Sequence, residues 1–473
     1  MTHTFHPTIL REYDIRGIIG ETLGPDDARA IGRGFGTLIK RANKDSGRGN
    51  LVAVGYDGRV SSPILEHALV EGLTATGCDV RRIGMGATPM LYYAEASAPE
   101  VDGGIQITGS HNPANYNGFK MVFQGRPFFG ADILKLGEMA ASGDWVDGAG
   151  SFETIEILDE YVERMLVDLA GIDESNLAAL KIGWDAGNGA AGPALELLTQ
   201  RLPGEHHLLY TEVDGNFPNH HPDPTVPENL EDLRKLVADK KLDFGVAFDG
   251  DGDRIGAIDG EGRIIWGDQL LMIYAEDLLK THQGATIIAD VKASRALFDC
   301  VAQHGGKPLM WKTGHSLIKS KMKETGSPLA GEMSGHVFFA DTYYGYDDAL
   351  YAGIRLIAAS ARLGKSVTQL RGEMPAMLNT PEMRFQVDES RKFAAIAEVK
   401  ERLAHATGVE VNDTDGVRVN TPDGWWLLRA SNTQDVLVAR AESDTQAGLD
   451  ALMAQIDEQL AASGLERGPQ AGH

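Results

Sequence analysis

The sequence predicts an α/β protein in which three similar mixed α/β domains precede a smaller C-terminal α+β domain. The chain has 473 residues, and at about 150 residues per domain this length corresponds to roughly three domains, within a range of two to four. Short apolar runs alternate with amphipathic helical stretches, and this alternation restarts twice. After about residue 374 the pattern changes to strands flanked by helices, which indicates an α+β domain.

The first two domains are assigned to residues 1–155 and 156–260. Their expected elements are, in order, a strand at 51–55, a helix at 63–76, a strand at 103–107, a strand at 181–185, a helix ending near residue 202, and a strand at 244–248. Each domain therefore has the rhythm of an α/β unit.

The third and fourth domains are assigned to residues 261–374 and 375–463. Their expected elements are a strand at 285–290, helices at 294–303, 316–323 and 347–363, a strand at 383–387, a helix ending near 404, strands at 417–420 and 425–430, and a helix at 445–460. Residues 378–383, which contain Thr380-Pro381, are predicted to be a linker, and the Gly/Pro-rich residues 464–473 a flexible tail.

Composition excludes several classes of protein. The 68 Asp and Glu residues outnumber the 44 Lys and Arg residues, and the net charge is −24. A nucleic-acid binder with a basic surface and a protein that binds anionic membranes are both disfavoured. The two cysteines, Cys78 and Cys300, are too few for a disulfide scaffold, and we expect both to be structural. The N-terminus lacks the apolar core of a secretory signal and no long apolar run follows, so we expect a cytoplasmic protein.

The first loop that could carry chemistry is Thr-Gly-Ser-His-Asn-Pro at 108–113, directly after a predicted strand. Glycine permits a sharp turn, Pro113 restricts the exit, and Ser110 is displayed at the strand end. Such a hydroxyl suits a nucleophile or a phosphate carrier. A turn whose polar side chains satisfy backbone donors is the alternative interpretation.

The second loop is Asp-Gly-Asp-Gly-Asp-Arg at 249–254. Asp249, Asp251 and Asp253 alternate with glycine, so their carboxylates can converge on one hard cation without crowding. An EF-hand needs glycine at its sixth position and glutamate at its twelfth, where this loop has Arg254 and Gly260, so calcium buffering is disfavoured. Arg254 indicates that an anion such as phosphate also binds. An Asx-rich turn remains the alternative.

The third loop is Gly-Glu-Met-Ser-Gly-His at 331–336, preceded by Lys-Thr-Gly-His at 312–315. Glu332, Ser334, His315 and His336 provide acceptors, donors and titratable groups suited to a polyhydroxyl ligand. Taken alone the pattern is weak, because a single histidine is more often a structural residue than a catalyst.

The fourth loop is Arg-Ala-Ser-Asn-Thr-Gln-Asp at 429–435, between two predicted strands of the last domain. Arg429, Ser431, Asn432 and Thr433, together with successive backbone amides, form a candidate phosphate site, with a polar hairpin turn as the alternative. Because ligands bind at strand ends in α/β units, one loop from each of the four domains predicts a single central cleft.

These four ordered loops resemble the α-D-phosphohexomutase family, and more closely its bacterial phosphomannomutase/phosphoglucomutase branch. The segments Tyr-Asp-Ile-Arg-Gly at 13–17 and Asn-His-His-Pro-Asp at 219–223 support the resemblance, which spans nearly the whole chain. It implies four domains around a central cleft, a phosphoserine at Ser110, and Mg²⁺ held by Asp249, Asp251 and Asp253 together with a phosphoryl oxygen on Ser110.

The resemblance also implies roles for other residues. It places Arg16, Lys120 and Arg254 near the reacting groups, Lys292 and His315 along the cleft, Glu332 and Ser334 at sugar hydroxyls, Tyr13 and His336 with the substrate, and Arg429, Ser431, Asn432 and Thr433 at the phosphate that is not reacting. Against a net charge of −24, these cations are interpreted as a local basic cleft that attracts a dianion.

The implied reaction is a mutase cycle on hexose phosphates. Phosphorylated Ser110 gives its phosphoryl group to O6 of glucose 1-phosphate or mannose 1-phosphate, and the resulting glucose 1,6-bisphosphate or mannose 1,6-bisphosphate turns around before the second transfer. Lys120 or His315 would move the hydroxyl proton, and the division between them stays open. The expected product feeds sugar-nucleotide and polysaccharide synthesis, and the expected state is a monomer or homodimer.

Two departures and three alternatives accompany this hypothesis. Gln434-Asp435 follows the last loop where the family often has an acidic residue and proline, and residues 345–351 only approximate an aromatic-rich family segment. The alternatives are a phosphoglucosamine mutase, against which Met333 argues by resemblance, a phosphosugar phosphatase, and a non-catalytic sugar-phosphate binder. A second phosphate loop favours a mutase, because a mutase must hold both ends of a bisphosphate.

Overall fold

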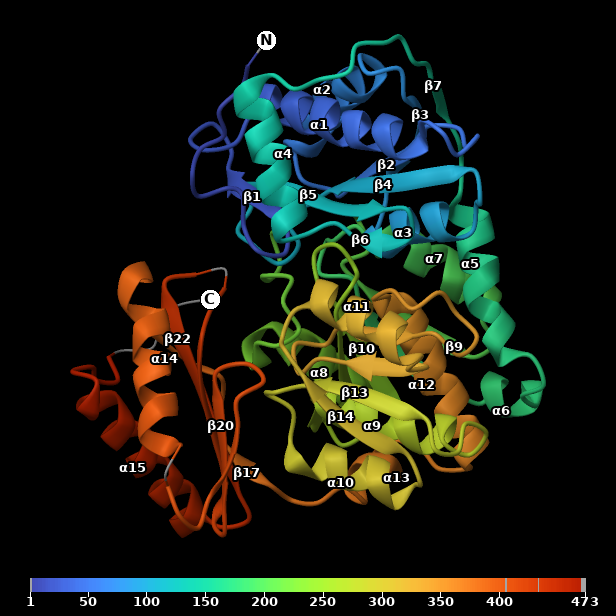
Figure 1. The fold of residues 1–473 in the computed structure, drawn as a ribbon. Helices are drawn as coiled ribbons and strands as arrows, with labels where there is room; N and C mark the ends of the chain where they lie inside the picture. The colour runs from blue at the N-terminus through green and yellow to red at the C-terminus, as the bar shows by residue number, and fades with distance from the viewer. Residues whose placement is uncertain (1, 405, 433, 469–473) are drawn as a thin grey trace.

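The computed structural model describes residues 2–404, 406–432 and 434–468, which form four domains, each built on its own sheet (Figure 1). The predicted fold class, three mixed α/β domains and a smaller C-terminal α+β domain, is confirmed. In the described residues, no helix combines the length and the apolar character needed to cross a bilayer.

The first domain contains a mixed seven-stranded sheet. Its order is β1 (Ile15–Ile18), β5 (Tyr116–Phe123), β4 (Val101–Ile107), β2 (Leu51–Tyr56), β3 (Asp79–Met85) and β7 (Phe152–Thr154), with β6 (Arg126–Pro127) added beside β5. Its helices are α1 (Pro25–Asn43), α2 (Ser62–Thr74), α3 (Thr88–Ala96) and α4 (Ala131–Ser142). Figure 1 shows α1 and α2 on one face of the sheet and α3 on the other, toward the rest of the molecule.

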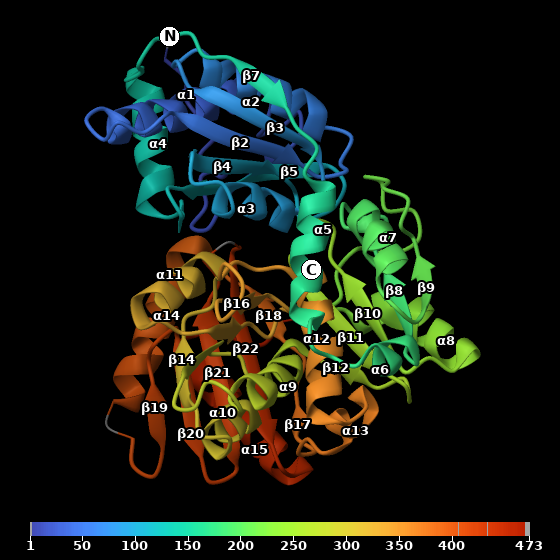
Figure 2. The ribbon, with the colours of Figure 1, turned by 90° about the vertical axis from the view of Figure 1, so that its right-hand side faces the viewer.

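The second domain has the order β12 (Ile264–Ile265), β11 (Ile255–Asp259), β10 (Phe244–Phe248), β8 (Lys181–Asp185) and β9 (Glu205–Leu209). Its helices are α5 (Leu158–Leu166), α6 (Glu174–Ala178), α7 (Gly192–Arg201) and α8 (Glu231–Lys240), with short 3₁₀ turns at Val167–Leu169 and Pro227–Leu230. Helix α5 descends from the first domain along the second (Figure 2).

The third domain has the order β14 (Lys307–Trp311), β13 (Thr286–Asp290), β15 (Leu329–Gly331) and β16 (Val337–Phe339). Its helices are α9 (Gly267–Leu278), α10 (Arg295–Gln303), α11 (His315–Thr325), α12 (Ala349–Leu363) and α13 (Val367–Gly372).

The three sheets share one topology. In each, three neighbouring strands are parallel and the last of them turns back into an antiparallel partner: β4 into β5, β10 into β11, and β15 into β16. The loops at these three turns are the serine loop, the three-aspartate loop and the Glu332 loop. The sequence predicted three similar units, and the structure adds that their chemical loops occupy equivalent places.

The fourth domain is an antiparallel sheet in the order β17 (Leu378–Asn379), β22 (Val436–Ser443), β21 (Gly424–Ala430), β20 (Val417–Thr421) and β19 (Glu410–Asn412), with β18 (Met383–Gln386) also paired to β22. Helices α14 (Glu389–Leu403) and α15 (Gln446–Ala462) cover its outer face (Figure 1). The prediction of a linker over 378–383 is wrong at its start, because backbone bonds to β22 make Leu378–Asn379 a strand.

The apolar cores divide the molecule unequally. One cluster of buried side chains runs through the first three domains, from Ala53 through Trp184 to Leu370. A second cluster, which includes Phe35 and Leu69, lies within the first domain alone, and the fourth domain has a separate core that includes Trp426 and Leu452. Cys78 is buried and Cys300 half-buried, and both are free thiols.

Candidate active site

A cavity of about 190 Å³ lies where loops of all four domains meet. The predicted site residues that line it are Tyr13, Arg16, Ser110, Lys120, Arg254, Lys292, His315, Glu332, Ser334, His336, Arg429, Ser431 and Asn432. The three aspartates lie buried beneath it, and Thr433 lies outside the described residues. The structure thus brings together side chains that the sequence separates by more than 400 residues.

Ser110 sits at the floor of this cavity, in the turn between β4 and β5. Its Oγ donates to Oδ2 of Asp249 at 2.9 Å and lies 3.2 Å from Nδ1 of His111. Its φ of 47° is in the left-handed region, which non-glycine residues seldom occupy. The turn therefore aims the hydroxyl at the carboxylates of the second domain.

The three carboxylates of Asp249, Asp251 and Asp253 converge. All are fully buried, and one oxygen from each lies within 4.8 Å of the others. Lys120 donates to Asp251 at 2.8 Å and also contacts Asp253. Among the described residues, nothing donates a hydrogen bond to Oδ1 of Asp251 or of Asp253. Buried, unsatisfied carboxylate oxygens beside a hydroxyl are the donor set that a hard divalent cation takes.

The electrostatics agree with that interpretation. Burial and then repulsion from neighbouring carboxylates raise the pKa of Asp249 and of Asp253. Burial alone would lower the pKa of Lys120, but Asp251 and Asp253 together raise it above its ordinary value. Lys120 is therefore an ammonium in this arrangement, and the loop needs positive charge.

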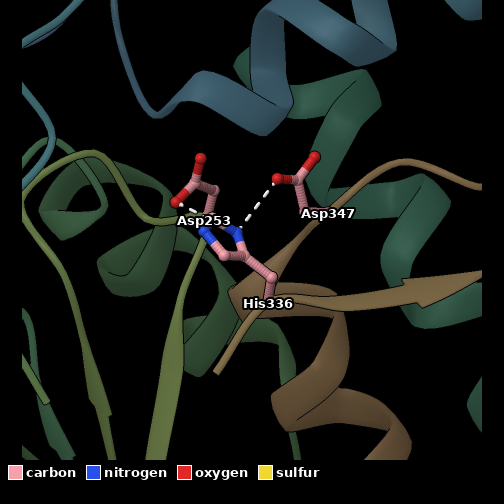
Figure 3. A group of neighbouring side chains, drawn as sticks. All are labelled: Asp253, His336 and Asp347. Atoms are coloured by element: carbon pink, nitrogen blue, oxygen red, sulfur yellow. Dashed lines mark ion pairs between the residues drawn. The ribbon is translucent and has the colours of Figure 1, made fainter. Parts of the chain in front are cut away.

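Arg254, the last residue of the aspartate loop, is tied to the third domain. Its Nε donates to Nε2 of His336 at 3.0 Å, so the proton of a neutral His336 ring must be on Nδ1. Figure 3 shows Asp253 and Asp347 on either side of this imidazole, and Nδ1 lies 3.0 Å from Asp347 Oδ2 and 3.6 Å from Asp253 Oδ1. Lys319 neutralises Asp347 at 2.9 Å. Asp253, His336 and Asp347 are residue types that bind metals. Here Arg254 already bonds to His336, and the charge of Lys319 offsets that of Asp347.

His315 is the first residue of α11 and stacks on His336 at a centroid distance of 5.5 Å. Burial, followed by repulsion from Lys319, lowers the pKa of His315 well below its ordinary value. The ring is neutral near pH 7 and can accept a proton, whereas Lys120 can donate one.

The loop of the third domain presents Glu332 and Ser334 to the cavity. Glu332 is 3% exposed, lines the cavity and accepts the backbone N–H of Gly314 through Oε1 at 2.6 Å. Burial raises the pKa of this carboxyl. Carboxylate and hydroxyl acceptors in a dry wall suit the hydroxyls of a sugar.

The loop between β21 and β22 closes the cavity from the fourth domain. Arg429 donates to Asp415 at 2.9 Å, and Asp415 also accepts the N–H of Thr313 at 3.1 Å. Asn432 donates to the hydroxyl of Tyr13 at 2.6 Å, and Tyr13 donates to the carbonyl of Thr313 at 2.9 Å. These bonds join the fourth domain to the first and third.

Lys292 pairs with Glu382 at 2.9 Å, and Glu382 also pairs with Arg384 at 2.8 Å. Sequence reasoning missed Glu382 because it fell inside the expected linker. It also missed other cavity residues, namely Arg11, Asp14, His111, Asn112, Arg384 and Gln434. Asp14, His111, Asn112 and Gln434 lie inside the quoted motifs without having been assigned a role, so membership of a motif was the available signal.

Comparisons with known proteins agree with this geometry. Four consecutive segments, 7–145, 159–262, 266–377 and 382–459, match the families described as phosphoglucomutase/phosphomannomutase alpha/beta/alpha domains I, II and III and the C-terminal domain. A phosphomannomutase/phosphoglucomutase from Pseudomonas aeruginosa is 45% identical over 460 residues, covering 97% of this chain and 96% of that protein. A phosphoglucomutase from Neisseria gonorrhoeae is 42% identical over 446 residues, covering 93% and 94%.

A solved structure is also similar along its whole length. The crystal structure of a phosphoglucomutase/phosphomannomutase family protein from Burkholderia thailandensis has a TM-score of 0.89 and 43% identity, covering 99% of each chain. Family matches in all four domains and relatives above 40% identity over nearly the full length leave one conclusion. The chain belongs to the phosphoglucomutase/phosphomannomutase family.

Proposed function

We propose that this protein interconverts the 1-phosphates and 6-phosphates of glucose and mannose through phosphorylated Ser110 and a hexose 1,6-bisphosphate. The observation that carries the proposal is the position of the Ser110 hydroxyl, 2.9 Å from Asp249 at the floor of a cleft whose opposite wall is a second phosphate loop. The names of the relatives, which include phosphomannomutase/phosphoglucomutase, support the same reaction class.

Asp249, Asp251 and Asp253, with the oxygen on Ser110, are the residues that would hold Mg²⁺. When bound, the ion supplies positive charge to the phosphoryl oxygens. Arg254, oriented by His336, would bind the equatorial oxygens from the other side.

The proton route follows from the charge states. As the substrate hydroxyl forms its bond to phosphorus, the bond from phosphorus to Ser110 Oγ breaks and the hydroxyl proton must leave. The neutral ring of His315 would accept that proton, and the ammonium of Lys120 would protonate Ser110 Oγ. The cycle then runs in reverse with the other end of the bisphosphate, so each group takes the opposite role.

The opposite wall would hold the phosphate that is not reacting. Arg429, Ser431 and Asn432 provide donors there, and Arg16, Lys292 and Tyr13 line the path between the two ends. Glu332 and Ser334 would bind hydroxyls of the sugar as it turns.

Broader features belong to the same proposal. We place the domains at 1–155, 156–260, 261–374 and 375–463, followed by a tail, with β12 (Ile264–Ile265) extending the sheet of the second domain past the second boundary. We place the protein in the cytoplasm as a monomer or homodimer. Hexose phosphates would be its partners, its product would enter sugar-nucleotide and polysaccharide synthesis, and a hexose 1,6-bisphosphate would act as intermediate and activator.

A coupled assay tests the proposal. Purified protein is given glucose 1-phosphate, mannose 1-phosphate or glucosamine 1-phosphate, with Mg²⁺ and with or without glucose 1,6-bisphosphate, and both 6-phosphate and free phosphate are measured. We expect 6-phosphates of glucose and mannose. Release of free phosphate alone would indicate a phosphatase, and turnover of only glucosamine 1-phosphate would indicate the amino-sugar mutase.

A further inference from the structure

A buried arginine outside the cleft holds the serine loop. Arg59 lies in the turn between β2 and α2 and is 1% exposed, so the substrate does not touch it. Its guanidinium donates to backbone carbonyls on both sides of the loop's bend, at 2.6 Å to Ser110, 2.6 Å to Asn112, 2.6 Å to Pro113 and 3.1 Å to Tyr116. One side chain therefore collects four carbonyls of the segment that carries the candidate nucleophile.

Asp57, two residues earlier, completes this support. Its Oδ2 accepts the N–H of Gly109 at 3.1 Å and Nε of Arg59 at 3.2 Å. Its Oδ1 accepts the hydroxyl of Ser62 at 2.6 Å and the N–H of Arg59 at 3.0 Å. Asp57 thus binds the N–H of Gly109, just before Ser110, and Arg59 binds backbone carbonyls from Ser110 to Tyr116.

The loop conformation needs such support. Ser110 has a φ of 47°, which costs energy for a residue with a side chain and persists only where the surroundings impose it. A Cβ at Gly109 would overlap the guanidinium of Arg59, so glycine is required for this close contact. Phe217 of the second domain packs against Arg59, with 5.2 Å between the guanidinium carbon and the centroid of the ring.

We propose that Arg59, oriented by Asp57, is a positioning residue that fixes Ser110 for phosphoryl transfer and protects its phosphorylated form from water. The inference rests on the proposed mutase function. A guanidinium suits the task because its planar fork has five donors, whereas a lysine ammonium has three and no fork. Loss of this support lets the hydroxyl leave its alignment with the carboxylates and the incoming substrate.

The expected consequence is a change in where the phosphoryl group goes. In hydrolysis, water attacks phosphorus, the bond to Ser110 Oγ breaks, the serine regains a proton and inorganic phosphate leaves. A displaced loop slows transfer to the sugar hydroxyl and opens this route. Because Arg59 does not contact the substrate, KM is expected to stay unchanged while kcat falls.

The experiment compares Arg59→Lys with Arg355→Lys and the unmodified protein. Arg355 is also buried and paired, with Asp341 at 2.8 Å, but lies in α12 away from the serine loop, so it controls for loss of a buried guanidinium. Each protein is phosphorylated with glucose 1,6-bisphosphate, and kcat, KM, melting temperature and the lifetime of the phosphoenzyme are measured.

We expect Arg59→Lys to lower kcat by about 100-fold, the effect of about 1 Å of misplacement, with KM unchanged and a shorter phosphoenzyme lifetime. Arg355→Lys should lower only the melting temperature. Wild-type kcat and phosphoenzyme lifetime in Arg59→Lys would overturn the inference, as would an equal loss of kcat in both variants.

A second variant keeps the test decisive if Arg59→Lys does not fold. Asp57→Asn retains an acceptor for the N–H of Gly109 but loses the charge that orients Arg59, so a smaller change in the same direction is expected. The two proposals fail differently. If the unmodified protein takes no phosphate onto Ser110, the mutase function is wrong, whereas normal cycling in the unmodified and Asp57→Asn proteins alike overturns only the positioning role.

Discussion

The first three domains and the fourth are joined in different ways. One apolar cluster includes residues of each of the first three, although the first also has a core of its own. The core of the fourth shares no residue with that cluster, and the fourth meets the third through a small cluster of Val291, Trp425 and Leu427. Polar contacts add to it: Arg418 donates to the carbonyl of Val291 at 2.6 Å, and Lys292 pairs with Glu382 at 2.9 Å. The bond from Asn432 to Tyr13, at 2.6 Å, ties the fourth domain to the first. Figure 1 shows the fourth domain beside the third, with its sheet on the side of the third domain and α14 and α15 on the far side.

The difference between the two kinds of domain contact indicates how a bisphosphate that must turn around can be held at both ends. The serine and the carboxylates belong to the part united by apolar packing. Water cannot replace these apolar contacts as it can replace a hydrogen-bond partner. The second phosphate loop belongs to the part held by polar bonds, each worth about 0.5–1.5 kcal/mol net between neutral groups and about 1.5–3 kcal/mol where one group is charged. We therefore expect the reacting end to be rigid and the other end to open and close.

The largest effect is expected from Ser110→Ala, because every phosphoryl group passes through that oxygen. Turnover should fall by roughly a factor of 10⁴ or more, as when other covalent nucleophiles are removed. Mass spectrometry after incubation with glucose 1,6-bisphosphate should find phosphate on Ser110 and, as a control, on the Ser46→Ala variant but not on Ser110→Ala. A phosphate at another residue with full activity would refute the assignment.

Removal of the metal from Asp249, Asp251 and Asp253 should lower turnover almost as strongly. Chelation should abolish turnover and Mg²⁺ should restore it, because three adjacent buried carboxylates without a dication repel the incoming phosphate. Asp251→Asn should lower turnover by more than about 100-fold, since even outer partners of a metal contribute about 10- to 100-fold. Full activity in metal-free protein would contradict the metal role.

In the fourth domain, Arg429→Ala should weaken substrate binding while Ser110 is still phosphorylated. A hydrogen bond to a charged group contributes about 1.5–3 kcal/mol, so KM should rise by about 10- to 150-fold. The bisphosphate should also escape before its second transfer, which chromatography of the reaction mixture would detect. Arg429→Lys, which keeps the charge, should show a smaller rise in KM. A wild-type KM in both variants would show that this loop is only a polar turn.

A smaller effect is expected from Tyr13→Phe, which removes one hydroxyl between Asn432 and Thr313. The cost should be about 1 kcal/mol. Hydrogen exchange should accelerate in the β21–β22 loop and stay unchanged around Ser110. Equal acceleration in both loops would show that the fourth domain is not held separately.

The smallest effect is expected from exchanging glucose for mannose, because these sugars differ only at C2 and Glu332 and Ser334 are proposed to bind other hydroxyls. Values of kcat/KM should agree within about tenfold, or about 1.4 kcal/mol. A larger preference measured in the coupled assay would mean that another residue contacts C2.

Much of the site was predictable because its chemistry is concentrated in short motifs. Thr108 to Pro113, Asp249 to Arg254 and the loop before His336 each combine turn residues with functional groups after an apolar run. Strand and helix positions could likewise be predicted, because the spacing of apolar residues is also a local property of the sequence. The linker prediction failed at Leu378 because two residues are too few to show a period, and their strand character comes from β22.

The sequence by itself determined the fold class and the four loops, because these depend on local pattern and residue type. The candidate nucleophile and metal ligands followed from the resemblance of the four ordered loops to a known family, since each loop alone left a polar turn as the alternative. Only the tertiary structure decided that Arg59 and Asp57 hold the serine loop, that Asp347 faces His336, and that Glu382 pairs with Lys292. Each is an ordinary charged residue whose partner lies in another loop of the same domain or across a domain boundary. Burial gives such a residue its role, since a charge removed from water must find its partner within the protein.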